Sequence, residues 1–296
     1  YGQINVEKTC DSSQKIATEN GNYIAYTITV TAGEDGCPDV SVVDTIVNNN
    51  KTSVECYVGI GASGSNLSGS PDNQNPYETI AEGRSHGRVR TNESGSMVWE
   101  IGNMAAYESR TLTYYVKLKD NVNLKNKEIK NKAVVYSKTY ERAYHEASFT
   151  PEIKYEMPKS QDGDIVRNSD GTYTIKYRLD FTLKKDTSNY ALKNFEFRDL
   201  LDASDIHTDE GALPYISYDR ESLNLYVKKD GSSAYAPVDN RDYTVSWANG
   251  DDNYITPWND PNSKPTRFKI TGAVDKPITV NPGDSYYVTY SVTVQP

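Results

Sequence analysis

The stretch Ile4-Asn5-Val6-Glu7-Lys8 decides how this sequence is interpreted, because a lysine occupies a position where an apolar residue belongs. Side chains alternate between the two faces of an extended strand, so Ile4, Val6 and Lys8 share one face. The first two residues indicate that this face is buried. A buried lysine is costly unless it is paired, and burial favours the neutral amine. The sequence must therefore supply Lys8 with partners.

Two further predicted strands carry a polar residue in an apolar row. In VVDTI at residues 42–46, Asp44 shares a face with apolar residues on either side. In IKNKAVV at residues 129–135, Asn131 alternates with apolar residues in the same way. One core then contains a lysine, a carboxyl group and a carboxamide, which are the components of an internal amide cross-link.

The chemistry of such a cross-link is simple. A neutral lysine amine attacks the carboxamide carbon of Asn131 and releases ammonia, provided that the carbonyl is polarised. A carboxylic acid in an apolar site keeps its proton, which lets Asp44 donate a hydrogen bond to the amide oxygen. The reaction modifies the protein once, so we predict no turnover and no enzyme. Taken singly, the three residues have ordinary interpretations: a lysine that reaches water, a turn aspartate and a strand-end asparagine.

The order Lys, Asp, Asn and the surrounding sequence resemble the isopeptide-forming domains of Gram-positive pilins and collagen-binding adhesins. The resemblance includes Val-Val-Asp-Thr-Ile, the strand at residues 98–102 and Ile-x-Asn-x-Ala-Val, and it covers residues 1–150 well and the rest more loosely. It implies that Lys8 and Asn131 are the bonded pair and that Asp44 is the catalytic acid.

The resemblance also implies a structural or adhesive module outside the cell, in the cell wall or pilus of a Gram-positive bacterium. The expected partners are host or bacterial surface macromolecules, either proteins or glycans, and neighbouring subunits or domains of the same surface protein. The formal net charge of −9 argues against nucleic acid. No apolar run is long enough to cross a bilayer, so we expect no membrane insertion. Neither a signal peptide nor a wall anchor is recognisable, which predicts a processed or excised piece.

Length and pattern predict an all-β protein with two tandem immunoglobulin-like β-sandwich domains, at residues 1–150 and 151–296. The 296 residues exceed a usual single core. Alternating strands separated by turns recur along the chain, without a capped amphipathic helix. Tyrosine, with 24 residues against 5 Phe and 3 Trp, suits half-buried strand positions.

The second half repeats the first. Lys159 precedes Tyr177 by the same number of residues as Lys8 precedes Tyr26, and Asp199 follows in the place of the first aspartate. No Ile-x-Asn-x-Ala segment follows. We therefore expect the second domain to be truncated before its last strand, with Lys159 and Asp199 unlinked beside an open strand edge.

The three cysteines, Cys10, Cys37 and Cys56, lie in the first fifth of the chain and match no zinc pattern. Cys10 follows Lys8 and Cys37 precedes the Asp44 strand. If these strands are neighbours, a Cys10–Cys37 disulfide is reasonable, and free buried thiols are the alternative.

Two other motifs give weaker functional signals. Residues 59–64 satisfy GxGxxG by letter but run into a Ser- and Gly-rich segment that cannot begin a helix, so we interpret them as a loop. Residues 249–253 and 259–260 offer oxygen ligands for calcium without EF-hand spacing, and solvated turns are the preferred interpretation. We predict neither a metal nor a cofactor.

The rival function is a carbohydrate-binding β-sandwich module of a secreted protein. Tyrosines together with Trp99, Trp247 and Trp258 can stack on sugars if they line one exposed groove. Exposed coplanar rings favour that alternative, whereas contact between buried Lys8 and Asn131 favours the cross-linked module.

Overall fold

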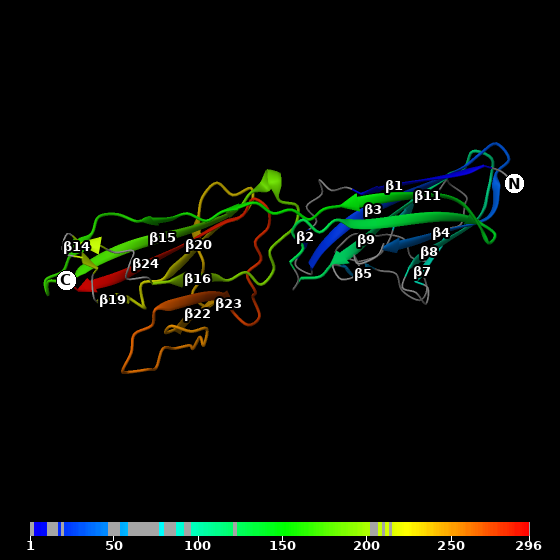
Figure 1. Ribbon diagram of the computed structural model, residues 1–296. Coiled ribbons are helices and arrows are strands. Elements are labelled where there is room, and N and C mark those ends of the chain that lie inside the picture. The colour runs from blue at the N-terminus through cyan, green and yellow to red at the C-terminus, as the bar shows by residue number, and fades with distance from the viewer. Residues whose placement is uncertain are drawn as a thin grey trace. The chain divides into compact units, whose positions relative to one another are not determined.

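The computed structural model describes residues 3–10, 17–18, 21–46, 54–58, 77–79, 87–91, 96–120, 123–201, 207–208, 211–212 and 215–295. The chain divides into two compact units, Tyr1–Ile153 and Lys154–Pro296, and both consist of β-strands (Figure 1). The predicted all-β class is therefore confirmed. Residues 59–64, with the GxGxxG letters, lie outside the described residues.

The first unit is a sandwich of two antiparallel sheets. Among the described strands, one sheet has the order β1-β3-β9-β5, with β2 on β3 and β6 on β9, and the other has the order β11-β10-β4-β8-β7. The strand bounds are β1 (Ile4–Cys10), β2 (Ala17–Thr18), β3 (Gly21–Ala32), β4 (Cys37–Ile46), β5 (Val54–Val58), β6 (Tyr77–Thr79), β7 (Arg88–Thr91), β8 (Met97–Met104), β9 (Ser109–Leu118), β10 (Ile129–Ser137) and β11 (Tyr140–Phe149). Consequently β1 and β10 belong to different sheets.

The second unit has a larger and a smaller sheet. The described strands give the orders β12-β15-β24-β20-β21, with β13 and β14 on β15 and β19 on β24, and β16-β23-β22, while β17 and β18 pair separately. A short 3-10 helix, Lys185–Thr187, follows β15. The strand bounds are β12 (Tyr155–Glu156), β13 (Lys159–Gln161), β14 (Val166–Arg167), β15 (Tyr173–Leu183), β16 (Phe197–Leu200), β17 (His207–Thr208), β18 (Gly211–Ala212), β19 (Tyr215–Tyr218), β20 (Asn224–Lys228), β21 (Ala236–Pro237), β22 (Tyr243–Ala248), β23 (Arg267–Gly272) and β24 (Ser285–Gln295).

Strict alternation builds the core of the first unit. Along β4 from Val40 onward, and along β9 and β10, every second residue is buried between the sheets. Ile28, Val42 and Leu112 have no exposed surface, and burial of each such side chain contributes about 1.5–3 kcal/mol. On the opposite face of β3 and β9, which lie side by side in Figure 1, threonine hydroxyls pair across the strands, as at Thr27 and Thr113, 3.3 Å apart.

The turn before β4 needs a glycine. Gly36 has φ +65°, and a Cβ there would lie 2.5 Å from the Met104 carbonyl oxygen. This position therefore requires a residue that has no side chain and adopts the left-handed backbone conformation. The turn fixes where the Asp44 strand starts.

The two units repeat one strand register. In the first unit, the cross-strand pairs are Lys8–Ile28, Tyr26–Tyr114 and Asp44–Met97. The corresponding pairs in the second unit are, in the same order, Lys159–Leu179, Tyr177–Tyr290 and Asp199–Phe268. Strands β13, β15, β24, β16 and β23 thus correspond to β1, β3, β9, β4 and β8.

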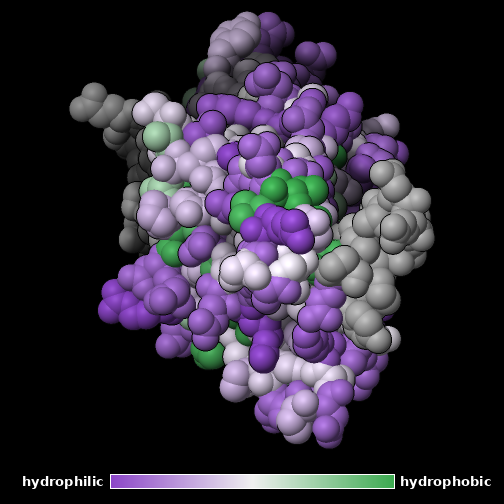
Figure 2. Space-filling model, turned by 90° about the vertical axis from the view of Figure 1, so that its left-hand side faces the viewer, coloured by the Kyte–Doolittle hydropathy of each residue, from purple (hydrophilic) through white to green (hydrophobic). Residues whose placement is uncertain are grey.

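The surface in Figure 2 is mainly hydrophilic, with small separate hydrophobic patches. Within the described residues, no helix has the length and apolar character needed to span a membrane.

Candidate cross-linking site

Three strands bring Lys8, Asp44 and Asn131 together inside the first unit. Lys8 comes from β1, while Asp44 and Asn131 come from the adjacent strands β4 and β10 of the opposite sheet, where Asp44 faces Ala133. Lys8 is 2% exposed and the other two residues are 0% exposed. The lysine ammonium donates a hydrogen bond to Asp44 Oδ2. All three residues are therefore on the inner face, where their alternation places them.

Tyr114 of β9 is the centre of this cluster, and the sequence argument did not assign it a role. Its hydroxyl donates to Asp44 Oδ2 at 2.7 Å and accepts hydrogen bonds from Lys8 Nζ and, at 3.0 Å, from Asn131 Nδ2. A hydroxyl has one proton to donate and two lone pairs, and all three are used here. The amine, the carboxyl group and the carboxamide thus meet at one oxygen atom.

Aromatic rings keep water from the lysine amine. Lys8 Nζ lies 4.5 Å from the ring centroid of Tyr26 and 4.7 Å from that of Tyr114, and the two rings stack with centroids 5.6 Å apart. Burial lowers the pKa of the Lys8 amine, although the neighbouring Asp44 opposes this shift. Burial also raises the pKa of Tyr26 well above its ordinary value, with further contributions from Cys10 and Asp44. The site favours uncharged forms of both groups.

The Asn131 carboxamide is held on one side only. Its nitrogen bonds to Tyr114, whereas Oδ1 is buried without a hydrogen-bond partner among the described residues. The direct hydrogen bond expected from Asp44 to this oxygen is therefore not formed, because the Tyr114 hydroxyl bonds to both side chains. An unpaired buried carbonyl costs about 1–3 kcal/mol, which indicates a site arranged for something other than stability.

His145 of β11 holds β1 against the opposite sheet. The backbone N–H of Lys8 donates to His145 Nδ1 at 2.7 Å. Since Nδ1 accepts this bond, the neutral ring carries its proton on Nε2. This contact fixes the position of Lys8 at the backbone, beside β10.

The second unit holds the counterpart pair in a more open setting. Lys159 Nζ lies 2.7 Å from Asp199 Oδ1, and Tyr218 donates to Asp199 Oδ2 at 2.6 Å. The amine is 5.3 Å from the Tyr177 centroid and 5.5 Å from that of Tyr290, so it sits between two rings as Lys8 does. Its side chain is 40% exposed, against 0% for that of Lys8.

The suggested disulfide between Cys10 and Cys37 is not formed, since the Cys37 thiol is free. Cys10 is the last residue of β1 and lies opposite Tyr26. Cys37 is the first residue of β4 and follows a turn in which the Gly33 N–H donates to the Gln3 carbonyl, so Cys37 lies near the start of β1. Six to seven residues of strand, about 20 Å, separate these ends. A disulfide requires Cα atoms closer than about 7 Å.

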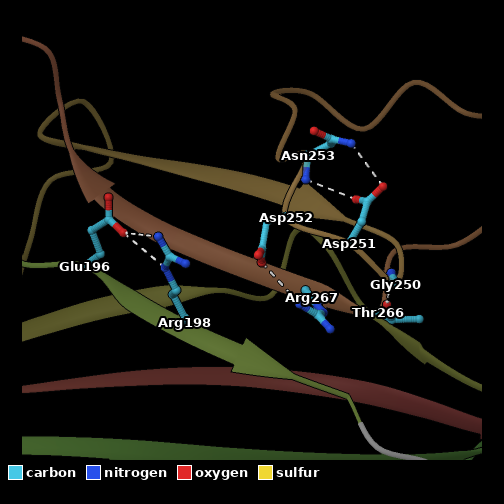
Figure 3. A network of polar contacts seen from close by, with 8 residues as sticks. All are labelled: Glu196, Arg198, Gly250, Asp251, Asp252, Asn253, Thr266 and Arg267. Carbon is cyan, nitrogen blue, oxygen red and sulfur yellow. Dashed lines mark hydrogen bonds and ion pairs between the residues drawn. The ribbon is translucent and has the colours of Figure 1, made fainter.

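The acidic loop considered for calcium is occupied by its own hydrogen bonds. Asp251 accepts hydrogen bonds from the backbone and side chain of Asn253 at 3.0 and 3.1 Å, and Asp252 pairs with Arg267 at 3.2 Å (Figure 3). In the part of the chain that the structure describes, no group of three or more His, Cys, Asp or Glu is placed to hold a metal ion. The loop is a turn held by Asx-type bonds.

No protein-family model and no curated protein matches the chain. Solved structures to which it is similar include the C-terminal domain of the Streptococcus agalactiae AgI/II polypeptide BspA, at 12% identity and TM-score 0.35, covering 98% of this chain and 91% of that one. They also include the C-terminal domain of the Streptococcus pyogenes antigen I/II-family protein AspA, at 11% identity and TM-score 0.35, covering 99% and 91%. Domains D2 and D3 of the major pilin SpaD from Corynebacterium diphtheriae match at 14% identity and TM-score 0.33, covering 94% and 73%. These values describe a loose likeness, and the function proposed below depends on the cluster around Tyr114.

Proposed function

We propose that this chain is a structural or adhesive module of a Gram-positive surface protein or pilus subunit, and that an amide bond between Lys8 and Asn131, made by the protein itself, stabilises its first unit. The observation that carries the proposal is the convergence of a buried lysine, a buried carboxyl group and a buried carboxamide on the Tyr114 hydroxyl. A buried ion pair alone adds little stability over an apolar core, so stability does not account for this arrangement.

The bond forms in two proton-coupled steps. Lys8 first passes one proton along its hydrogen bond to Asp44, which leaves a neutral amine and a neutral acid. The amine then attacks Cγ of Asn131, the new C–N bond forms, and the old one breaks to release ammonia. The ammonia leaves with the proton held by Asp44 as ammonium, and Asp44 regains its negative charge. Tyr114 bonds to all three groups and aligns them throughout.

This bond joins the two sheets of the first unit. Lys8 lies on β1 in one sheet, and Asn131 lies on β10 in the other. Along the chain, β1 lies near the start of the first unit and β10 near its end. A force applied at Tyr1 and Ile153 therefore passes through the bond instead of through the strands between them. An extracellular attachment that must survive tension and proteolysis gains directly from such a connection.

Single-molecule pulling tests this role. We expect the unchanged chain to show no extension from residues 9–130 of the first unit at forces that unfold hydrogen-bonded sheets. In Asn131→Ala, the same residues extend by about 400 Å, since about 120 residues contribute roughly 3.5 Å each. The second unit, present in both proteins, provides the internal control. If the unchanged chain released the same length as Asn131→Ala, this role would be wrong.

The described tryptophans and the Tyr226–Tyr287 pair do not form the exposed platform that the carbohydrate-binding alternative needs. Trp99 and Trp247 are buried, and Trp258 is half-buried and donates to the Ser263 carbonyl at 3.0 Å. The outer rings Tyr226 and Tyr287 stack on each other at 4.4 Å. Arg178 lies over the Tyr287 ring at 3.7 Å from its centroid. These ring faces are therefore already covered by protein.

A further inference from the structure

The strand that carries Lys8 is held to the opposite sheet through one histidine. Among the described strands, β1 pairs only with β3, in the sheet that does not contain Asn131. Its other edge packs against β11 (Figure 1). The Lys8 N–H points toward that edge and donates to His145 Nδ1 at 2.7 Å, while Lys8 lies opposite Ile28 of β3. This hydrogen bond therefore ties the backbone of the reacting lysine to the sheet of the asparagine.

His145 lies close to the asparagine within that sheet. Strands β10 and β11 pair so that Asn131 is opposite Ala147 and Ala133 is opposite His145. The bond from Lys8 to His145 thus helps to set the distance between the backbones that the amide joins. An attacking atom must come within about 3–3.5 Å of its target, and a misplacement of about 1 Å can cost about a hundredfold in rate. The ring acts on the reaction through position, without touching the reacting groups.

This hydrogen bond requires a neutral imidazole. The neutral ring has one N–H and one acceptor nitrogen, and Nδ1 is the acceptor here. The imidazolium ion donates from both nitrogens, so its Nδ1–H would face the Lys8 N–H. The side chain is exposed, which lets protons reach it from water. Protonation of His145 therefore breaks the bond and releases this edge of β1 from β11.

The charged residues next to His145 come from its own strand and from both strands beside it. Glu146 follows it on β11, Lys132 lies on β10, and Glu7 and Lys8 lie on β1. The Lys8 amine points into the core, and Lys132 Nζ lies 4.4 Å from the centroid of a tyrosine ring. The two glutamates are exposed, so water and salt screen their effect on the imidazole.

We propose that His145 is a positioning residue for the amide bond between Lys8 and Asn131, and that its neutral ring makes bond formation dependent on pH. The bond forms quickly near neutral pH and slowly in acid, where the protonated ring no longer holds β1. Once the amide exists, protonation of His145 does not reverse it. The proposal rests on the cross-link proposed above and adds the residue that controls when it forms.

The test measures the rate of bond formation against pH. Complete chain isolated unfolded and unlinked from inclusion bodies is refolded by dilution into buffers between about pH 5 and about pH 8, which brackets the titration of an ordinary imidazole. Samples are denatured at intervals, and intact mass gives the fraction that has lost one ammonia. The unchanged chain is expected to react at least about tenfold more slowly at the acid end, on the scale of a small misplacement.

Two variants at position 145 separate position from protonation. In His145→Asn, the carboxamide oxygen occupies the place of Nδ1 and accepts without titrating, so the acid rate is expected to stay close to the neutral rate. In His145→Leu, which has no acceptor, the rate is expected to be low at every pH. The matched control is Glu146→Gln, which changes an exposed charge beside the ring and is expected to keep the profile of the unchanged chain.

The outcomes are distinct. The same pH profile in the unchanged chain and His145→Asn overturns the proposal, as does a His145→Leu chain that reacts as fast as the unchanged one. If no chain loses ammonia at any pH, the cross-link itself is wrong and this proposal falls with it.

A second measurement does not depend on bond formation or on a variant at position 145. In Asn131→Ala, the NMR shift of the Lys8 amide proton is expected to follow the titration of the His145 ring. A Lys8 amide that stays unchanged while the ring titrates also overturns the proposal.

Discussion

Replacing Asn131 with alanine is expected to lower the free energy of unfolding of the first unit by about 4–5 kcal/mol through loss of the cross-link. A bond between Lys8 and Asn131 closes a loop of more than a hundred residues, and the entropy model for chain cross-links gives this magnitude. Loss of the hydrogen bond from Asn131 to Tyr114 adds about 1 kcal/mol. Urea unfolding, followed by a signal from the first unit, measures the change.

A double-mutant cycle separates the cross-link from the other effects. Lys8→Met removes the amine but keeps the length of the side chain, and it also prevents the bond. If the bond exists, the large loss appears in each single variant and only once in the double variant, which gives a coupling of about 4–5 kcal/mol. Losses that simply add would show that the two residues are not joined.

Replacing Tyr114 with phenylalanine is expected to slow bond formation by about a hundredfold, on the scale of losing one positioned hydrogen-bond donor. The hydroxyl contacts Lys8, Asp44 and Asn131 at once. Freshly refolded Tyr114→Phe is therefore expected to contain unlinked chain. The fraction of linked chain, measured by mass over time, gives the rate.

Tyr26→Phe is the matched control. Tyr26 stacks on Tyr114 and flanks the same amine, but its buried hydroxyl has no hydrogen-bond partner among the described residues. Its loss is expected to leave the rate close to that of the unchanged chain. Equal slowing in both variants would indicate that ring packing, and not the Tyr114 hydroxyl, controls the reaction.

The sequence predicts much of this site because strand alternation has a period of two. Lys8, Asp44 and Asn131 each interrupt an apolar row, and an interruption is visible without any tertiary information. Tyr114 interrupts nothing, since a tyrosine between Leu112 and Val116 is typical of a core strand. Its signal lies in the repeat, because Tyr290 occupies the same register against Tyr177.

Features that depend on which strands are neighbours, and in which direction they run, could not be read from one sequence. The Cys10–Cys37 disulfide was wrong for this reason, since β1 and the start of β4 place the thiols at opposite ends. Tyr155 and Met157 alternate in step with Lys159, yet both are exposed. Whether a face is buried depends on what covers it, and no described strand does so beside β16.

The most direct test of the central claim is the intact mass of the complete chain, denatured and reduced, compared with that of Lys8→Met. The Lys8–Asn131 bond predicts that the unchanged chain is lighter than its sequence by one ammonia, and that Lys8→Met has the full mass of its sequence. A full mass for the unchanged chain, or a deficit that persists in Lys8→Met, would contradict the cross-link.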